Sequence, residues 1–369
     1  MVRTDAGMLS LAVSFPPLVR LNGYWEEKYP EMVLSARERS LSGVWNPGPD
    51  APRDPFTLSM LPFLKDPFRG TIARRFLAPG QTALDLEEDS AIQALKAAGL
   101  APRDIDLTLV ASFLPDQIGV GNAAFLAQRM GLSGNAWNIE TGSNGALAAL
   151  ETACAFVKSG QAERVLVVIS CTYSRGLKET DALIWSVGDG AAAFVVGKVG
   201  NNEGLLAVQG FHTGETCGAM SYEFELDQSG APVPRVRDSE KGGQIVRETA
   251  ERYVLECCER VLEKANLRLG DIDFFVTATP MAWYSRFTSS VLGFEPHQTI
   301  DTHALYANTG PVLVPTNLHA AVATGRIRRG DVVLLYAAGS ASSRAAAVVR
   351  WGEVRVGQLP GEGVLELAA

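Results

Sequence analysis

The sequence predicts an α/β fold in which one structural unit occurs twice. The segments ALKAAGLAPRDIDLTLVAS and VLEKANLRLGDIDFFVTAT each contain a helix end, a turn, the triplet Asp-Ile-Asp and an apolar strand. The later segments KSGQAERVLVVIS and ATGRIRRGDVVLLY agree in the same way. Asp271 follows Asp104 by 167 residues and Gly325 follows Gly160 by 165, so both matches occur in the same order at nearly one offset. We therefore expect a duplicated unit of about 165 residues whose apolar strands are covered by helices.

The duplication divides the chain into an N-terminal half, 1–200, and a C-terminal half, 201–369. The remaining predicted elements of the first half are as follows. Residues 1–35 begin with an apolar, strand-like run and continue into an acidic, helix-like patch. Proline is frequent at about 45–70 and no clean hydrophobic period appears there, which predicts a surface insertion or loop in the first half. Helical spacing resumes in LDLEEDSAIQALKAAGL, just before the first Asp-Ile-Asp.

The chain is organised around AWNIETGSNGALAALETACAFV, at residues 136–157. WNI is strand-like, Gly142 and Gly145 flank Ser143, and strong helix formers follow. Ser143 is therefore expected where a strand ends and a helix begins, over the unpaired amides of the first helical turn. This position suits a nucleophile. It also suits a helix N-cap, for which serine is a preferred residue.

Composition limits the function classes. The 369 residues are 47% hydrophobic and 20% charged with a net charge of −8, which is typical of a soluble globular protein and argues against nucleic-acid or anionic-membrane binding. The five cysteines have no metal-like spacing and are expected to be reduced thiols in a cytoplasmic protein. No apolar run approaches the ~18 residues of a membrane-spanning helix. Pro16 and Pro17 interrupt the apolar start, so we expect no signal peptide.

The duplication connects Ser143 with a second turn. Moving 165 residues along the chain from Ser143 leads to Asn308, in LYANTGPVLVP. We expect both residues at equivalent strand-to-helix turns. A pseudo-two-fold axis between the halves would bring these two helix N-termini to one point.

Several motifs resemble β-ketoacyl-acyl-carrier-protein synthase III of the thiolase superfamily. The resemblance extends from about Arg74 to Trp351, and its most specific parts are SVGDGAAAFVVG, ANTGPVLVPTNL, GRIRRGDVVLL and YAAGSAS. It implies a five-layered α-β-α-β-α fold and a homodimer. It also implies an acyl group carried as a thioester of coenzyme A or of an acyl carrier protein, delivered through a pantetheine tunnel with no further cofactor and no metal.

That family works with a Cys-His-Asn set. The resemblance implies that Ser143 stands at the position of the cysteine, which takes the acyl group, and that Asn308 is the asparagine. The histidine position falls on Ala278, with Thr279 beside it. Two of the three chemical groups are therefore changed.

The resemblance also implies a surrounding site. The amides of Ser143, Gly339 and Ser340 would form an oxyanion hole. Trp283 and Arg286 lie just past the altered histidine position and are candidates for binding the pantetheine or nucleotide arm, although aromatic core packing accounts equally well for Trp283.

A serine cannot replace a cysteine without a base. Lowering a hydroxyl pKa from ~15.7 to neutral pH requires about nine units, or roughly 12 kcal/mol. A helix dipole supplies about 1 kcal/mol. Ser143 therefore needs a general base.

Of the four histidines, only His303 is a candidate for this base. It lies five residues before Asn308 and leads into the same turn. His212, His297 and His319 are better explained by structural or surface positions.

Three functions remain open. In the first, Ser143 forms an oxyester from an acyl thioester and passes the acyl group to a carrier protein, an alcohol or an amine, in polyketide or other secondary-metabolite biosynthesis. In the second, the chain is an inactive synthase-like subunit that forms a heterodimer with an active paralogue. In the third, Asn308 and the oxyanion amides orient substrates for condensation or hydrolysis without a covalent intermediate. An α/β-hydrolase is disfavoured, because Thr141 occupies the first glycine position of G-x-S-x-G and the duplication has no place in that fold.

Overall fold

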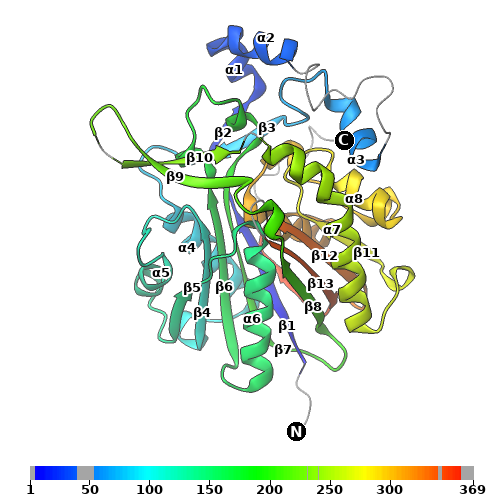
Figure 1. The fold of residues 1–369 in the computed structure, drawn as a ribbon. Coiled ribbons are helices and arrows are strands. Elements are labelled where there is room, and N and C mark those ends of the chain that lie inside the picture. Colours follow the sequence, from blue (N-terminus) through cyan, green and yellow to red (C-terminus); the bar gives the residue numbers. More distant parts are fainter. Residues whose placement is uncertain (1–4, 40–53, 231, 240, 340–342, 359–369) are drawn as a thin grey trace.

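Two large β-sheets organise the computed structural model, which describes residues 5–39, 54–230, 232–239, 241–339 and 343–358 (Figure 1). The six-stranded sheet has the order β14-β1-β7-β6-β4-β5, and the four-stranded sheet has the order β11-β12-β13-β8. The first sheet comprises β1 (Ala6–Ser14), β4 (Leu107–Phe113), β5 (Asn135–Asn138), β6 (Arg164–Thr172), β7 (Asp189–Lys198) and β14 (Arg355–Val356). The second comprises β8 (Gly204–His212), β11 (Phe274–Thr277), β12 (Val332–Gly339) and β13 (Ser343–Arg350). Two smaller antiparallel pairs are β2 (Leu18–Leu21) with β3 (Ala73–Phe76), and β9 (Met220–Leu226) with β10 (Pro232–Asp238).

Helices form three layers around these sheets. The layer between the sheets consists of α6 (Gly145–Ser159) and α10 (Leu313–Ala323), whose apolar side chains join one core cluster with both sheets. The outer layer on the first sheet is α4 (Ala83–Ala98) with α5 (Ala123–Met130), and the outer layer on the second is α7 (Gly242–Ala265) with α8 (Tyr284–Leu292). The remaining helices are α1 (Asn22–Lys28), α2 (Pro30–Arg39), α3 (Pro55–Met60) and α9 (His303–Tyr306). This arrangement confirms the predicted five-layered α-β-α-β-α fold.

The Asp-Ile-Asp triplet makes the same contacts in both halves. In each half a helix ends at a left-handed residue, Gly99 after α4 and Asn266 after α7, and a short 3₁₀ turn follows. The first aspartate accepts a hydrogen bond from the backbone N–H three residues earlier, at 2.8 Å in both halves. The second accepts from a backbone N–H at the start of the neighbouring strand, β6 or β12. The sequence similarity therefore reflects one local structure built twice.

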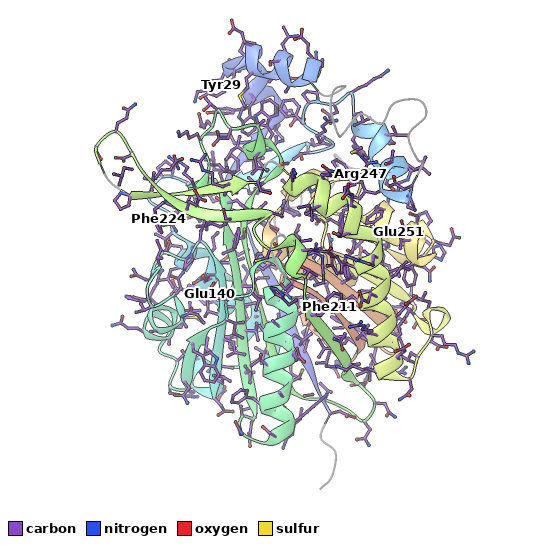
Figure 2. The ribbon with its side chains drawn as sticks, viewed as in Figure 1. Tyr29, Glu140, Phe211, Phe224, Arg247 and Glu251 are labelled. Atoms are coloured by element: carbon purple, nitrogen blue, oxygen red, sulfur yellow. The ribbon has the colours of Figure 1, made fainter. Side chains whose placement is uncertain are left out.

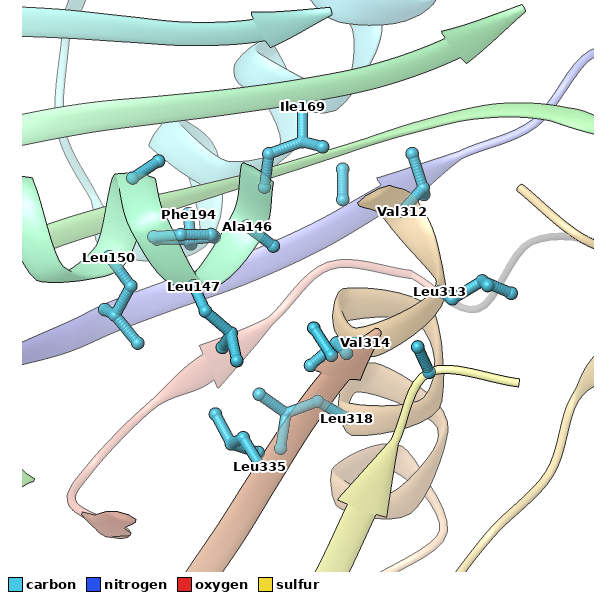
Figure 3. Packing of buried hydrophobic residues seen from close by; sticks show 14 of the residues in the cluster. Ala146, Leu147, Leu150, Ile169, Phe194, Val312, Leu313, Val314, Leu318 and Leu335 are labelled. Atoms are coloured by element: carbon cyan, nitrogen blue, oxygen red, sulfur yellow. The ribbon is translucent and has the colours of Figure 1, made fainter. Parts of the chain in front are cut away.

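The two central helices pack against each other between the sheets. Figure 3 shows Ala146, Leu147 and Leu150 of α6 facing Val314 and Leu318 of α10. All five side chains are at most 3% exposed. This packing fixes where the N-terminus of each helix lies relative to the other.

The expected loop at about 45–70 is only partly accounted for. Residues 45–53 lie outside the described residues. Residues 55–63 are helical, as α3 and the 3₁₀ turn η2 (Leu61–Phe63), and Phe56 and Met60 are at most 2% exposed in the cluster that covers α8. The loop alternative is therefore wrong for residues 55–63, because their aromatic and apolar side chains are buried against α7 and α8, whereas the insertion stays a prediction.

An arm formed by β9 and β10 was not predicted from the sequence. Its base packs on the body of the protein, where the Tyr222 and Phe113 rings are 4.7 Å apart. Its outer part projects from the body and carries Phe224, which is 57% exposed (Figures 1 and 2). In the described part of the chain, no helix combines the length and the apolar character needed to span a membrane.

Candidate active site at the N-termini of the central helices

Ser143 lies in the middle of η4 (Gly142–Asn144), the 3₁₀ turn that leads into α6. Gly142 has a φ of +63°, a left-handed conformation that glycine adopts without strain. Asn144 is the N-cap of α6, and no side-chain hydrogen bond caps either η4 or α6. Ser143 is buried, with 7% of its surface exposed. Its hydroxyl is therefore not used as a helix cap, which was the structural alternative to a role in catalysis.

Asn308 is held by backbone contacts to the first half of the chain. Its N–H donates to the carbonyl oxygen of Ser186 at 2.8 Å, and its carbonyl oxygen accepts from the N–H of Gly188 at 2.9 Å. Its side-chain Oδ1 accepts from the N–H of Gly310 at 2.9 Å. Nδ2 makes no hydrogen bond with the described residues, so within them it is available to donate to a ligand, and a donor is what a thioester carbonyl oxygen needs.

The turn that carries Ser143 lies against the turn that follows Asn308. η4 contacts η10 (Gly310–Val312), the 3₁₀ turn that leads into α10. A Cβ on Gly145 would lie 3.1 Å from Ala111 Cβ and 3.5 Å from Pro311 Cβ, so a glycine here permits the close approach. The meeting of the two helix N-termini agrees with the prediction from the duplication.

The positions within the two turns are not the equivalent ones that the 165-residue offset suggested. Gly142 and Gly310 each open the 3₁₀ turn before a central helix, both have positive φ, and they are 168 residues apart. The residue equivalent to Asn308 is therefore Glu140, and not Ser143. The offset changes by three residues because the connections between the matched segments differ in length.

Three buried oxygen atoms next to these turns have no hydrogen-bond partner among the described residues. They are Thr141 Oγ1, Asn144 Oδ1 and Thr309 Oγ1. An unpaired buried polar group costs about 1–3 kcal/mol, and most buried polar groups are paired. All three residues are sequence neighbours of Ser143 or Asn308, so these unpaired oxygens gather around the candidate site.

His303 is buried, and both of its ring nitrogens are engaged. Nδ1 lies 2.8 Å from the carbonyl oxygen of Thr279, so it must carry the proton, and Nε2 accepts from the hydroxyl of Thr71 at 3.0 Å. Burial lowers the pKa of His303 to about 4, so the ring is neutral at pH 7. The structure therefore corrects the expectation for His303: its lone pair is used by Thr71, and none of its described contacts is with Ser143.

Ala278 is buried at the end of β11, on the face that joins the core between the sheets. The adjacent Thr279 is also buried, and its hydroxyl accepts from Asn317 Nδ2 at 3.2 Å. No imidazole is supplied from this strand end. Asp301 also lies here, where its Oδ1 accepts from the N–H of His303 at 2.8 Å.

The proposed oxyanion hairpin connects β12 with β13. Gly339 ends β12 and pairs with Ser343, whereas Ser340 lies outside the described residues. The Ser343 hydroxyl donates to the carbonyl oxygen of Thr141 at 3.3 Å. This contact brings the hairpin to within two residues of Ser143.

The two predicted substrate contacts differ in exposure. Trp283 is 5% exposed, and its ring lies 6.4 Å from that of Phe56 and 5.9 Å from that of Phe63. Arg286 is exposed on α8. Trp283 thus has packing partners that account for its burial, and both substrate contacts stay predictions.

Two carboxyl groups near the site were missed in the sequence. Glu140 precedes Ser143 by three residues, is exposed, and has a pKa raised by partial burial (Figure 2). Asp301 lies at the surface beside His303, and partial desolvation of its carboxyl raises its pKa to about 7. No local motif marks either carboxyl as a base, because the resemblance assigns that chemistry to a histidine.

Two cavities adjoin the core, and neither is lined by Ser143 or Asn308. The larger, of about 660 Å³, lies between β1, α4 and β14 and includes Phe15, Arg75 and Lys96 in its wall. The smaller, of about 10 Å³, lies between α6 and α10. The pantetheine tunnel therefore stays a prediction.

Comparison with known proteins places this chain in a family. The profile of the 3-oxoacyl-[acyl-carrier-protein] synthase III C-terminal region matches residues 262–351, and that of the synthase III region matches residues 137–214. The β-ketoacyl-[acyl-carrier-protein] synthase III of Chelativorans sp. is 31% identical over 286 residues, which cover 76% of this chain and 88% of the relative.

Two solved structures share the fold. The synthase III of Thermus thermophilus superposes with a TM-score of 0.76 at 26% identity, over 94% of this chain and 99% of that one. The priming β-ketosynthase of the R1128 polyketide pathway superposes with a TM-score of 0.76 at 21% identity, over 95% and 97%. The chain therefore belongs to the 3-oxoacyl-[acyl-carrier-protein] synthase III family of the thiolase fold.

Proposed function

We propose that the protein is an acyltransferase that works through Ser143. It takes an acyl group from an acyl-CoA or acyl-carrier-protein thioester and passes it to a carrier protein or a small-molecule acceptor in polyketide or other secondary-metabolite biosynthesis. The family's acyl-transferring condensing enzymes support a transferase. The observation that supports the specific proposal is the contact of η4, which contains Ser143, with η10, which begins two residues after Asn308.

The proposed reaction uses the acyl thioester, the acceptor and groups of this chain. Ser143 Oγ attacks the thioester carbonyl carbon while its proton passes to a base, and the carbonyl oxygen gains negative charge that Asn308 Nδ2 and the amides of Ser143 and Gly339 stabilise. The carbon–sulfur bond then breaks, and the thiol leaves with a proton. An acceptor hydroxyl, amine or thiol next attacks the oxyester and regenerates Ser143.

Intact-mass spectrometry tests this proposal. After exposure to a panel of acyl-CoA and acyl-carrier thioesters, the wild-type protein should gain the mass of one acyl group. Ser143→Ala should gain none. Ser159→Ala is a matched control, because it removes an exposed hydroxyl at the other end of the same helix and should acylate normally. Equal acylation of wild type and Ser143→Ala rules the proposal out.

The inactive subunit is the second candidate. It is favoured by the engagement of both nitrogens of His303, which leaves Ser143 without a described imidazole partner. Co-expression with a cysteine-bearing paralogue followed by size analysis distinguishes the candidates: a stable heterodimer favours this one, and a homodimer that acylates alone removes it. The non-covalent alternative predicts that Ser143→Ala keeps full turnover.

A further inference from the structure

Arg344 is a buried cation with no carboxylate partner among the described residues. It lies on β13, is 2% exposed, and forms no described ion pair. Its neighbours on that face of the strand, Ala346 and Val348, belong to the cluster under α7 and α8. Burying an unpaired charge is costly, and Arg344 Nε has no hydrogen-bond partner among the described residues, so the compensation comes from the bonds of Nη1.

Those hydrogen bonds converge on one hairpin. Nη1 of Arg344 donates to the carbonyl oxygen of Gly339 and, at 3.0 Å, to that of Ser343. These two residues are the last pair of the β12–β13 ladder, so they are the two ends of the connection between the strands. The guanidinium also lies 5.5 Å from the centre of the Tyr253 ring on α7, a distance at which a cation is attracted to the ring face.

The hairpin ends connect Arg344 with the site on the other face of the sheet. Successive residues of a strand point to opposite faces, so Ser343 faces the central layer while Arg344 faces α7. The Ser343 hydroxyl reaches the carbonyl oxygen of Thr141, two residues before Ser143. A Cβ on Gly339 would lie 2.8 Å from both the carbonyl oxygen and the hydroxyl of Ser343, so this end of the ladder closes only around a glycine.

We propose that Arg344 is a positioning residue for acyl transfer. By binding both carbonyl oxygens it holds the ends of the hairpin together, which keeps Ser343 against Thr141 and the end of β12 against η4. The catalytic part of this inference rests on the proposed function, whereas the coupling of Arg344 to the Ser143 turn does not. A cation that only stabilised the second half would leave that turn unchanged.

The first arm of the test measures single-turnover acylation in Arg344→Met, Arg344→Lys and Arg350→Met. Arg350 is the matched control, because it lies on the same strand and donates to the carbonyl oxygen of Gly330, at the end remote from the hairpin. We expect Arg344→Met to slow acylation about 10- to 100-fold, the effect of a small misplacement of catalytic groups. Arg344→Lys should recover part of the rate, because it restores a charged donor, and Arg350→Met should stay within about twofold. Wild-type rates in Arg344→Met would overturn the proposal.

The second arm does not depend on acyl transfer. Hydrogen exchange should speed up in Arg344→Met, and less so in Arg344→Lys, in the peptide covering residues 139–147, whereas Arg350→Met should leave that peptide protected. Ser343→Ala should give the same local change, and combining it with Arg344→Met should add little, because both act through one contact. The coupling would be refuted if hydrogen exchange at 139–147 were unchanged, or if the effects of Ser343→Ala and Arg344→Met on it were fully additive. This holds even if Ser143 becomes acylated. If wild type forms no acyl enzyme in intact-mass spectrometry, this arm still decides the coupling. If Arg344→Met does not fold, Arg344→Lys replaces it in the acylation assay and in the double-variant comparison with Ser343→Ala.

Discussion

At the scale of single residues, the proposed acyl transfer depends on which group accepts the proton of Ser143 Oγ. The N-terminus of α6 stabilises negative charge by about 1 kcal/mol, far short of what an alkoxide needs. His303 donates to Thr279 and accepts from Thr71, so the proton must go elsewhere. Glu140 is a carboxyl three residues away, and its raised pKa makes it a better base than an ordinary glutamate.

Glu140→Gln should therefore slow acylation of Ser143. Loss of a general base typically costs about 10²- to 10⁴-fold, and in wild type the rate should rise with pH as Glu140 deprotonates. Rapid-quench mass spectrometry over a range of pH measures both effects. Glu151→Gln, an exposed glutamate on α6, is the control. A wild-type rate and pH profile in Glu140→Gln would exclude it as the base.

Asp189 makes stability depend on pH. It is buried, accepts from the N–H groups of Leu77 and Ser174, and has a pKa raised to about 6 by burial, compared with 3.8 in an unfolded chain. Between these pH values the folded state binds more protons than the unfolded one, so the contribution of Asp189 to stability is greatest below pH 3.8 and is lost as pH rises to 6. About two pKa units correspond to roughly 3 kcal/mol.

Urea unfolding of wild type and Asp189→Asn at pH 4 and pH 7 isolates this contribution. From pH 4 to pH 7, the unfolding free energy of wild type should fall relative to that of Asp189→Asn by up to roughly 3 kcal/mol. A difference that stays constant with pH would contradict the assignment.

At the scale of elements, the segment 187–188, just before β7, sets the position of Asn308. Val187 forms a β-bridge with Asn308, and a Cβ on Gly188 would lie 2.4 Å from the carbonyl oxygen of Tyr306. Gly188 of the motif SVGDG therefore leaves room for the first half to bind the backbone that carries Asn308. Ala307 adopts a φ of +57° in the same segment, so this backbone is already strained.

Gly188→Ala should move Asn308 and lower stability. Overpacking against backbone costs typically about 1–3 kcal/mol, and the acylation rate should fall with the displacement of the amide. Denaturation and acylation assays measure these effects. Gly293→Ala gives a contrast: a Cβ there meets no atom within 4 Å, so any loss of stability comes from its positive φ alone and acylation should be unaffected. Normal acylation by Gly188→Ala would show that the segment does not position the site.

Elements differ in how well the sequence predicts them. The helix–turn–strand units around Asp-Ile-Asp and the turn at Ser143 follow from local signals, namely glycine positions, apolar strands and strong helix formers. The β9–β10 arm and the burial of α3 depend on contacts with distant segments, such as Tyr222 with Phe113, that no local pattern records. Arg344 was equally hidden, because its two acceptors are backbone carbonyls and its effect passes through Ser343.

At the scale of the whole molecule, the β5 edge of the first sheet pairs with no further strand among the described residues. β5 is the edge strand, and beside it Ile118 and Val120 are 62% and 66% exposed, while Trp137 is 36% exposed. Asn138 of β5 donates to the carbonyl oxygen of Val120 at 2.8 Å, so this loop and the strand form one surface. An unpaired edge with apolar neighbours suits pairing with a second subunit. We therefore expect the proposed homodimer to form here.

Val120→Lys should shift a wild-type dimer toward monomer in sedimentation experiments. The side chain is mostly exposed in the single chain, so its replacement should change the fold little. Ile92→Lys, which alters another exposed apolar residue on α4, should leave the dimer intact. A monomeric wild type, or an undisturbed Val120→Lys dimer, would remove β5 as the interface. A dimer that forms only with a paralogue would favour the inactive-subunit candidate.

The central claim is that one turn from each half presents Ser143 and Asn308 to the same substrate. A crystal structure of Ser143→Ala with a bound acyl-CoA tests it most directly. The account predicts the thioester carbonyl oxygen at about 3 Å from Asn308 Nδ2, with the carbonyl carbon over residue 143. A thioester bound elsewhere, or residues 143 and 308 facing separate spaces, would contradict the mechanism and leave only the fold.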